Sequence, residues 1–356
     1  MNQQELTVLN VGQNLDDLMN LDPRGYGVCR ILYKGARDYT GKPLTVNAAE
    51  QLIKTVKKDD LVYIITGFVL LPFKKAEMDG IVGSMLLARA LVKAFEAKPV
   101  IVCPVDNLKA VENLAYIMGL HLTDDLDYLK TMPLTMGVKT YTKDHAEAEA
   151  EADKLIAKHL PSAVIAVEAP GRNAKGVAHN ATGLDVTEIE AKSDVLFAKL
   201  QQKGVLNIAI GDLGNEIGMS AIKDHILRYI PYAREGACRC GCEGGILAAT
   251  AADHIVTATT SDWGAYGIIA ALAYLLDNID VAVTPELERE ALVTASRSGM
   301  IDMYGWLIPA VDGFNAAINV GIAGLMYETV KSALSLKQTC ATWFEKVLEL
   351  GFYQGK

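Results

Sequence analysis

Short apolar runs rich in β-branched residues recur along the chain, and segments of helical periodicity separate them. The runs predicted as strands are Leu61–Thr66, Val100–Val105, Ala163–Val167, Leu206–Ile210 and His254–Thr259. Strands that are hydrophobic on both faces and alternate with helices are typical of a parallel sheet buried between helices. The pattern therefore predicts an α/β fold with three layers, in which helices cover a mainly parallel sheet.

The helices are predicted from spacing and residue type. Gly80–Ala97 has apolar residues at helical spacing and joins the first two strands into a βαβ unit. His145–Leu160 opens with alternating Ala and Glu, which favour helix over strand, so it is predicted as a helix with a solvated acidic face. Further helices are expected at Ala48–Lys57, Asn107–Met118, Val186–Lys203, Ser220–Tyr229, Ala265–Leu276, Pro285–Ser298 and Ile318–Leu336.

The 356 residues contain no repeat of fixed period and no low-complexity linker. With 51% hydrophobic residues, the chain has ample apolar material for one large core. We expect a single domain with two lobes, residues 1–140 and 141–356, that meet near Lys139–Lys143.

Charge and hydropathy exclude several classes of protein. The net charge is −9 and basic residues do not cluster, which argues against a nucleic-acid partner. The most apolar stretches fall short of the roughly 20 residues that cross a bilayer, so no membrane span is predicted. The polar start lacks the features of a signal peptide, and Cys29, Cys103 and Cys340 lie far apart among apolar neighbours as reduced thiols. These features predict a cytoplasmic protein.

Acidic residues follow four of the predicted strands: Asp106, Glu168, Asp212 and Asp262. In open α/β sheets, ligands bind beyond the carboxyl ends of the strands, so these side chains are candidates for one site. The alternative is structural, because Asp often caps the helix after a turn. Convergent carboxylates would need a divalent cation, a bound ammonium group or raised pKa values.

The segment Gly211–Met219 is the densest local motif, with Asp212, Asn215 and Glu216 among three glycines directly after a strand. It matches neither the dinucleotide-binding glycine fingerprint nor the phosphate-binding loop, so no nucleotide cofactor is predicted. A strand-to-helix turn capped by Asn215 is the structural alternative.

A second motif, Val167–Asn173, places Glu168 and Arg172 around a Pro-Gly turn. Arg suits two-point capture of a carboxylate, the charge of an acidic amino-acid substrate. A structural Glu–Arg pair would explain the same residues.

Cys238, Cys240 and Cys242 alternate along the chain, unlike the Cys-x-x-Cys pairs of zinc knuckles. A zinc or iron–sulfur role stays open. On a strand the three thiols would share one face, where they could serve as small residues near a ligand pocket. His179 is predicted as a core or rim residue.

At these same segments the chain resembles the D-glutamate cyclase family. The motifs that carry the resemblance are Thr66-Gly67-Phe68, Glu77–Gly80, Glu168–Arg172, Gly211–Met219, Ala252-Asp253, Ser261–Tyr266 and Val311-Asp312-Gly313. The family usually has Asn at the position of Asp262 and Gly at that of Leu213, and these departures concern the substrate more than the fold.

The resemblance implies cyclisation of D-glutamate to 5-oxo-D-proline with loss of water, in an enclosed acidic cavity that holds Mg²⁺ or Mn²⁺. It assigns Asp212, Glu216 and Glu168 as metal ligands or acid–base groups, and Arg172 as the partner of the substrate α-carboxylate. The remaining substrate-binding predictions are Asp79, Asn173, Asn215, Asp262, Trp263 and Tyr266. A divalent-metal-dependent hydrolase, for example of a phosphate ester, and a non-catalytic acidic amino-acid binding protein are the alternatives. A homo-oligomer is possible.

Overall fold

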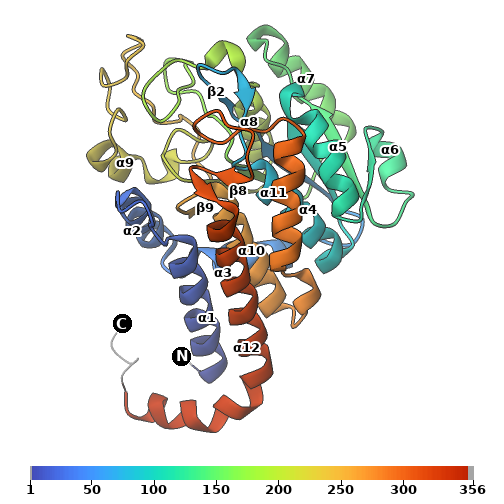
Figure 1. Ribbon diagram of the computed structural model, residues 1–356, viewed down its shortest axis with the longest axis vertical. Coiled ribbons are helices and arrows are strands. Elements are labelled where there is room, and N and C mark those ends of the chain that lie inside the picture. Colours follow the sequence, from blue (N-terminus) through green and yellow to red (C-terminus); the bar gives the residue numbers. More distant parts are fainter. Residues whose placement is uncertain (1, 352–356) are drawn as a thin grey trace.

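A seven-stranded parallel sheet forms the centre of the computed structural model, which describes residues 2–351 (Figure 1). Its strand order is β5-β6-β4-β1-β7-β8-β9. The strands are β1 (Leu61–Thr66), β4 (Lys98–Cys103), β5 (His121–Thr123), β6 (Thr135–Thr140), β7 (Ala163–Val167), β8 (Leu206–Gly211) and β9 (His254–Thr257). Two-residue strands form small hairpins, β2 (Val69–Leu70) with β3 (Lys75–Ala76) and β10 (Ala310–Val311) with β11 (Phe314–Asn315).

The order of the strands reverses between β1 and β7. After β1 the chain adds β4, β5 and β6 toward one edge, and from β7 onward it adds β8 and β9 toward the other. Right-handed crossovers in opposite directions place α4 and α5 on one face of the sheet, and α7 and α8 on the other. The sheet is therefore doubly wound, with its topological switch point at the carboxyl ends of β1 and β7.

The helices are α1 (Gln3–Met19), α2 (Val28–Thr40), α3 (Leu44–Thr55), α4 (Ile81–Phe95), α5 (Leu108–Ile117), α6 (Leu126–Leu129), α7 (His145–Lys158), α8 (Ser193–Gln202), α9 (Lys223–Tyr229), α10 (Ser261–Leu275), α11 (Pro285–Arg297) and α12 (Ala316–Glu349). Helix α10 is apolar on all sides and is buried from Ser261 to Tyr274 among α1, α3, α4 and α12. Helices α1 and α12 lie side by side and extend beyond the sheet (Figure 1). No helix within residues 2–351 is long and apolar enough to span a membrane.

The structure confirms the α/β prediction and the five predicted strands to within two residues at each end. The sheet joins strands from both sides of Lys139–Lys143, because β6 pairs with β4 while β7 pairs with β1. Cys29 and Cys103 are buried free thiols, and the side chain of Cys340 lies outside the described residues. The three alternating cysteines do not lie on a strand, since the chain from 231 to 250 forms turns and bends.

Candidate active site

The carboxyl ends of the three central strands are in register. Thr66 pairs with Val167, and Val167 pairs with Ile210. The residues that follow therefore meet at one edge of the sheet, and among them are Glu168 and Asp212. This edge is the switch point, where doubly wound sheets bind their ligands.

Glu168 is held in a conformation that non-glycine residues rarely adopt, with φ of 43°. Such strain costs on the order of 1 kcal/mol or more and is concentrated at functional sites. Its Oε2 accepts a hydrogen bond from Ser261 Oγ at 2.6 Å. The glycine at position 80 permits a close approach, since a Cβ there would lie 2.5 Å from that of Glu168. The backbone thus aims this buried carboxylate toward the start of α10.

Glu216 organises the loop that carries Asp212. Its Oε1 accepts hydrogen bonds from the backbone N–H groups of Asp212 at 2.9 Å and Leu213 at 2.7 Å, and its Oε2 accepts one from Gly214 at 2.6 Å. The loop therefore folds as a tight turn around the Glu216 carboxylate. Asp212 stands at the start of this turn, and its Oδ1 is buried with no hydrogen-bond partner among the described residues.

Asp79 and Asp262 cap each other's helices. Asp79 accepts hydrogen bonds from the N–H groups of Ser261 and Asp262 at the start of α10. Asp262 Oδ1 in turn accepts from the N–H groups of Gly80 and Gly83 at the start of α4. Carboxylates are favourable at these positions because they satisfy free N–H groups at the positive end of the helix dipole. Two helix N-termini are thereby fixed at the switch point.

Two overlapping carboxylate sets are close enough to share a cation. Ligand atoms of Glu168, Asp212 and Glu216 lie within 4.8 Å of one another, and so do those of Asp79, Asp212 and Asp312. Asp212 belongs to both sets. Asp312 lies at the tip of the β10–β11 hairpin and belongs to one of the family-like motifs, but the sequence does not predict it as a site residue, because nothing in it indicates that this hairpin reaches the sheet.

The pKa values of three of these carboxyl groups are strongly raised. Burial, then the charges of Glu168 and Asp312, hold the pKa of Asp212 well above its usual range. Burial, then Glu216 and Asp79, do the same to the pKa of Glu168. Burial and then Asp312 raise the pKa of Asp79 to about 7. Such shifts mark groups whose charged forms lack compensation, and they are common at functional sites.

Positive charge near this cluster comes from Arg24. Its Nη2 lies 3.6 Å from Asp312 Oδ2 and donates a hydrogen bond to the carbonyl of Thr259. Its guanidinium also lies over the ring of Phe314, 4.7 Å from the centroid. Within residues 2–351, no other ion pair reaches a member of the two carboxylate sets. One arginine cannot balance five carboxylates, so the site fits a divalent cation or a cationic ligand.

Arg172 contacts Asp194 and His145 rather than Glu168. Its Nε donates to Asp194 Oδ2 at 2.8 Å, and its Nη1 lies 2.5 Å from His145 Nδ1. The pair with Asp194 is largely buried, with 14% and 8% of the side chains exposed. Asp194 belongs to α8, so Arg172 ties the loop after β7 to that helix. The contact with a substrate carboxylate stays a prediction.

We expect Arg172→Ala to lower the free energy of unfolding by about 3 kcal/mol, because it leaves the buried Asp194 carboxylate unpaired. Its effect on the Michaelis constant for the substrate tests the predicted contact with a substrate carboxylate separately. Urea unfolding and steady-state kinetics measure the two effects, and Asp194→Asn is the matched control. A Michaelis constant that rises strongly in Arg172→Ala and not in Asp194→Asn would support the predicted substrate-binding role, whereas an unchanged Michaelis constant in Arg172→Ala would contradict it.

Three of the other predicted substrate-binding side chains donate hydrogen bonds within the chain. Asn173 Nδ2 donates to the carbonyl of Gly245 at 2.7 Å, and Asn215 Nδ2 donates to that of His179 at 3.0 Å. Trp263 is fully buried, and its Nε1 donates to Asn319 Oδ1 at 2.7 Å. Tyr266 is also buried in α10. These contacts support the walls of the site, and direct substrate contacts by these residues stay predictions.

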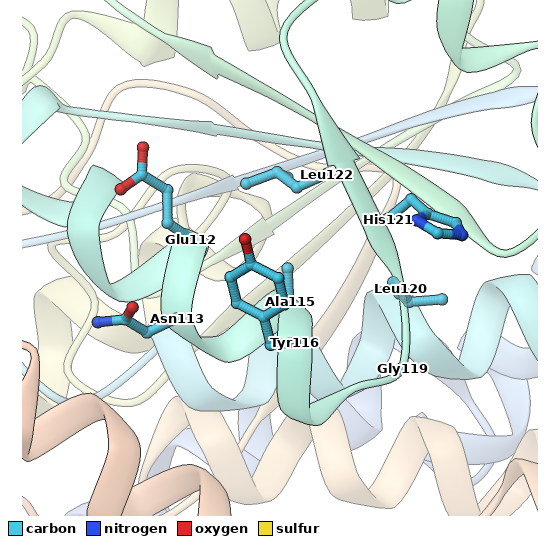
Figure 2. A pocket seen from close by; sticks show the side chains of 8 residues that line it. All are labelled: Glu112, Asn113, Ala115, Tyr116, Gly119, Leu120, His121 and Leu122. Atoms are coloured by element: carbon cyan, nitrogen blue, oxygen red, sulfur yellow. The ribbon is translucent and has the colours of Figure 1, made fainter.

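A surface depression lies apart from the carboxylates, between α5 and the edge strand β5. Figure 2 shows Glu112 and Tyr116 on α5, with His121 and Leu122 on the facing strand. Strands β6 and β4 separate β5 from the switch point. The depression also lacks the convergent buried charges of the carboxylate cluster, and no function is assigned to it.

Fold and site together define a doubly wound α/β protein with buried carboxylates at its switch point. The chain belongs to the D-glutamate cyclase-like C-terminal family, whose model matches residues 15–323, and the resemblance found in its motifs is thereby confirmed. Over 114 residues it is 32% identical to the human protein "D-glutamate cyclase, mitochondrial". That match covers 32% of this chain and 17% of the human protein.

Proposed function

We propose that this protein cyclises D-glutamate to 5-oxo-D-proline with loss of water, assisted by Mg²⁺ or Mn²⁺ at the carboxylate cluster. The observation that carries the proposal is the convergence of five carboxylates, four of them buried, around Asp212 at the switch point beside a single arginine, in a chain of this family. The burial of these groups also supports an enclosed acidic cavity.

The reaction needs three things from the protein. The α-ammonium group must lose a proton before its nitrogen can attack the γ-carboxyl carbon. The charge on the γ-carboxylate must be neutralised, and an oxygen must leave as water. The substrate must also be held folded, because closing a five-membered ring gains greatly from orientation. No phosphate donor is required, in keeping with the absence of a phosphate-binding loop motif.

The residues that would hold the cation are Asp212, which belongs to both sets, with Glu168 and Glu216 from one set and Asp79 and Asp312 from the other. Oxygen ligands of this kind suit Mg²⁺ and Mn²⁺. A cation bound there would neutralise the γ-carboxylate and polarise its carbon–oxygen bond. Asp212 Oδ1 is the best placed ligand atom, since no protein donor occupies it among the described residues.

Glu168 is our choice for the acid–base group. Its raised pKa makes the Glu168 carboxylate a stronger base than an ordinary glutamate, so it could carry to the departing oxygen the two protons that the nitrogen loses, one before and one after the attack. The Ser261 hydroxyl donates a hydrogen bond to its Oε2 and holds the carboxyl group in place. Arg24 is the proposed partner of the substrate α-carboxylate, because its guanidinium borders the cluster and is held by Phe314 and Thr259.

We expect the purified protein to convert D-glutamate into 5-oxo-D-proline with Mn²⁺ present, to lose this activity in EDTA, and to regain it when Mn²⁺ is restored. Chiral chromatography measures the product, and L-glutamate and a phosphate ester are the parallel substrates. Release of phosphate without lactam formation would identify a hydrolase instead. Tight binding of glutamate without turnover at any metal concentration would identify a binding protein.

A further inference from the structure

A second group of ligand-type side chains lies outside the carboxylate site. Cys238, Cys240 and Cys242 come from the long loop between α9 and β9, and His179 comes from the segment after β7. Ligand atoms of the four residues all lie within 4.8 Å of one another. Some sixty residues separate the histidine from the cysteines, so the fold alone brings them together.

Four of the six distances between these ligand atoms lie near the edge lengths of a tetrahedral metal site. Cys238 Sγ lies 3.5 Å from Cys242 Sγ and 3.7 Å from Cys240 Sγ. His179 Nε2 lies 3.1 Å from Cys240 Sγ and 3.4 Å from Cys242 Sγ. Zn–S bonds of about 2.3 Å and Zn–N bonds of about 2.0 Å, at tetrahedral angles, separate two sulfurs by about 3.8 Å and a sulfur from a nitrogen by about 3.5 Å. A disulfide would instead bring two sulfurs to about 2.05 Å.

The surroundings of the cluster suit thiolate ligands. His179 is fully buried and directs Nε2 at the sulfurs. Cys242 Sγ accepts from the backbone N–H of Gly244 at 3.4 Å and faces Asn173 Nδ2 at 3.5 Å. N–H donors of this kind stabilise an anionic sulfur and orient it, as the outer partners of metal ligands do. The loop turns back at Gly245, where a Cβ would lie 2.2 Å from the carbonyl oxygen of Ala233.

We propose that His179, Cys238, Cys240 and Cys242 bind one zinc ion. A set of three thiolates and one imidazole in tetrahedral positions is typical of zinc. Because all four positions are filled by protein, none is open to a substrate, and the ion is structural. The ligands are soft, whereas those of the carboxylate cluster are hard, so the two sites select different metals.

The zinc would hold together the loops that shape the carboxylate site. His179 accepts a hydrogen bond through its carbonyl from Asn215 Nδ2, next to Glu216. Asn173 Nδ2 bonds the carbonyl of Gly245 in the cysteine loop, and the N–H of Gly171 donates to the carbonyl of Asn215. The metal therefore anchors a loop without regular secondary structure to the turn that carries Asp212 and Glu216. Loss of the zinc is expected to loosen that turn.

The test is the metal content of the full chain, purified without chelators and with any affinity tag removed. Plasma mass spectrometry should find about one zinc per chain, the content of a closed four-ligand site. Cys240→Ser should lose most of this zinc, whereas Cys29→Ser, which removes a buried thiol elsewhere, should keep it. Asp212→Asn should keep it as well. A chain without zinc, or one that loses zinc in Asp212→Asn but not in Cys240→Ser, would overturn the proposal.

Two measurements on the unaltered protein remain decisive if Cys240→Ser fails to fold. Cobalt exchanged into the site should show thiolate-to-cobalt charge-transfer absorption and the visible bands of a tetrahedral ion. Titration with an organic mercurial should release the zinc in step with modification of the three cysteines. A disulfide between Cys238 and Cys242 in peptide mapping of freshly purified protein would contradict the proposal, and so would an octahedral cobalt spectrum.

Discussion

Asp212→Asn is expected to lower kcat/KM for D-glutamate on the order of 1000-fold, the scale seen when one preorganised charged or polar group is removed from an active site. Asp212 is the carboxylate common to both sets, so its loss weakens every arrangement of a shared cation. The amide keeps the size of the side chain but removes its charge. Stopped-time assays at saturating Mn²⁺ measure the rate.

The variant should also separate a metal ligand from a structural residue. Without metal, Asp212→Asn should melt at the same temperature as the parent chain or higher, because one of several repelling buried charges has gone. The rise in melting temperature that Mn²⁺ gives the parent should disappear. Asp16→Asn is the control, since Asp16 is a buried carboxylate that accepts hydrogen bonds from the N–H groups of Leu44 and Thr45 and belongs to neither carboxylate set. It should lose stability yet keep both turnover and the Mn²⁺ effect. Full activity in Asp212→Asn would contradict the proposed cation site.

The central strands were predictable because burial on both faces leaves a continuous apolar signal. In β7, Ala163–Val167 is buried throughout and was located without error. The outer strands β5 and β6 were missed because His121–Thr123 is partly exposed and Thr135–Thr140 contains a glycine and a lysine. These segments form strands only through pairing with their neighbours. Helix α1 was also missed, although Asn2 and Glu5 form a capping box that its sequence displays.

The site was predictable to the extent that its residues follow strands. Glu168 and Asp212 come directly after β7 and β8, and parallel pairing brings such residues together. Asp312 and Arg24 come from a hairpin tip and an N-terminal connection, whose positions depend on tertiary packing that periodicity does not reveal. The orientation of the Arg172 side chain likewise depends on its ion pair with Asp194, which lies in helix α8. For the same reason, periodicity does not predict that His179 lies beside the three cysteines.

The metal-free protein is expected to lose stability as the pH rises from about 4 to about 8, with its melting temperature falling by about 5–10 °C. Asp79 and Glu190 have folded-state pKa values raised to about 7 and about 8, mainly by burial, and burial also raises the pKa values of Glu168 and Asp212 well above their usual range. In the unfolded chain these carboxyls ionise near pH 4. Between those limits the folded state binds more protons, so each rise in pH favours unfolding.

Mn²⁺ should reverse this trend, because it binds the ionised carboxylates and the folded site offers them together. Its effect on the melting temperature should therefore be small near pH 5 and large near pH 8. Calorimetry in EDTA and in Mn²⁺ across this range measures both curves. Asp212→Asn and Glu168→Gln should flatten the metal-free curve, while Asp127→Asn, at an exposed carboxylate paired with Lys158, should not. A metal-free protein that grows more stable between pH 5 and pH 8 would show that the cluster is compensated within the chain itself, and the case for a bound cation would fall with it.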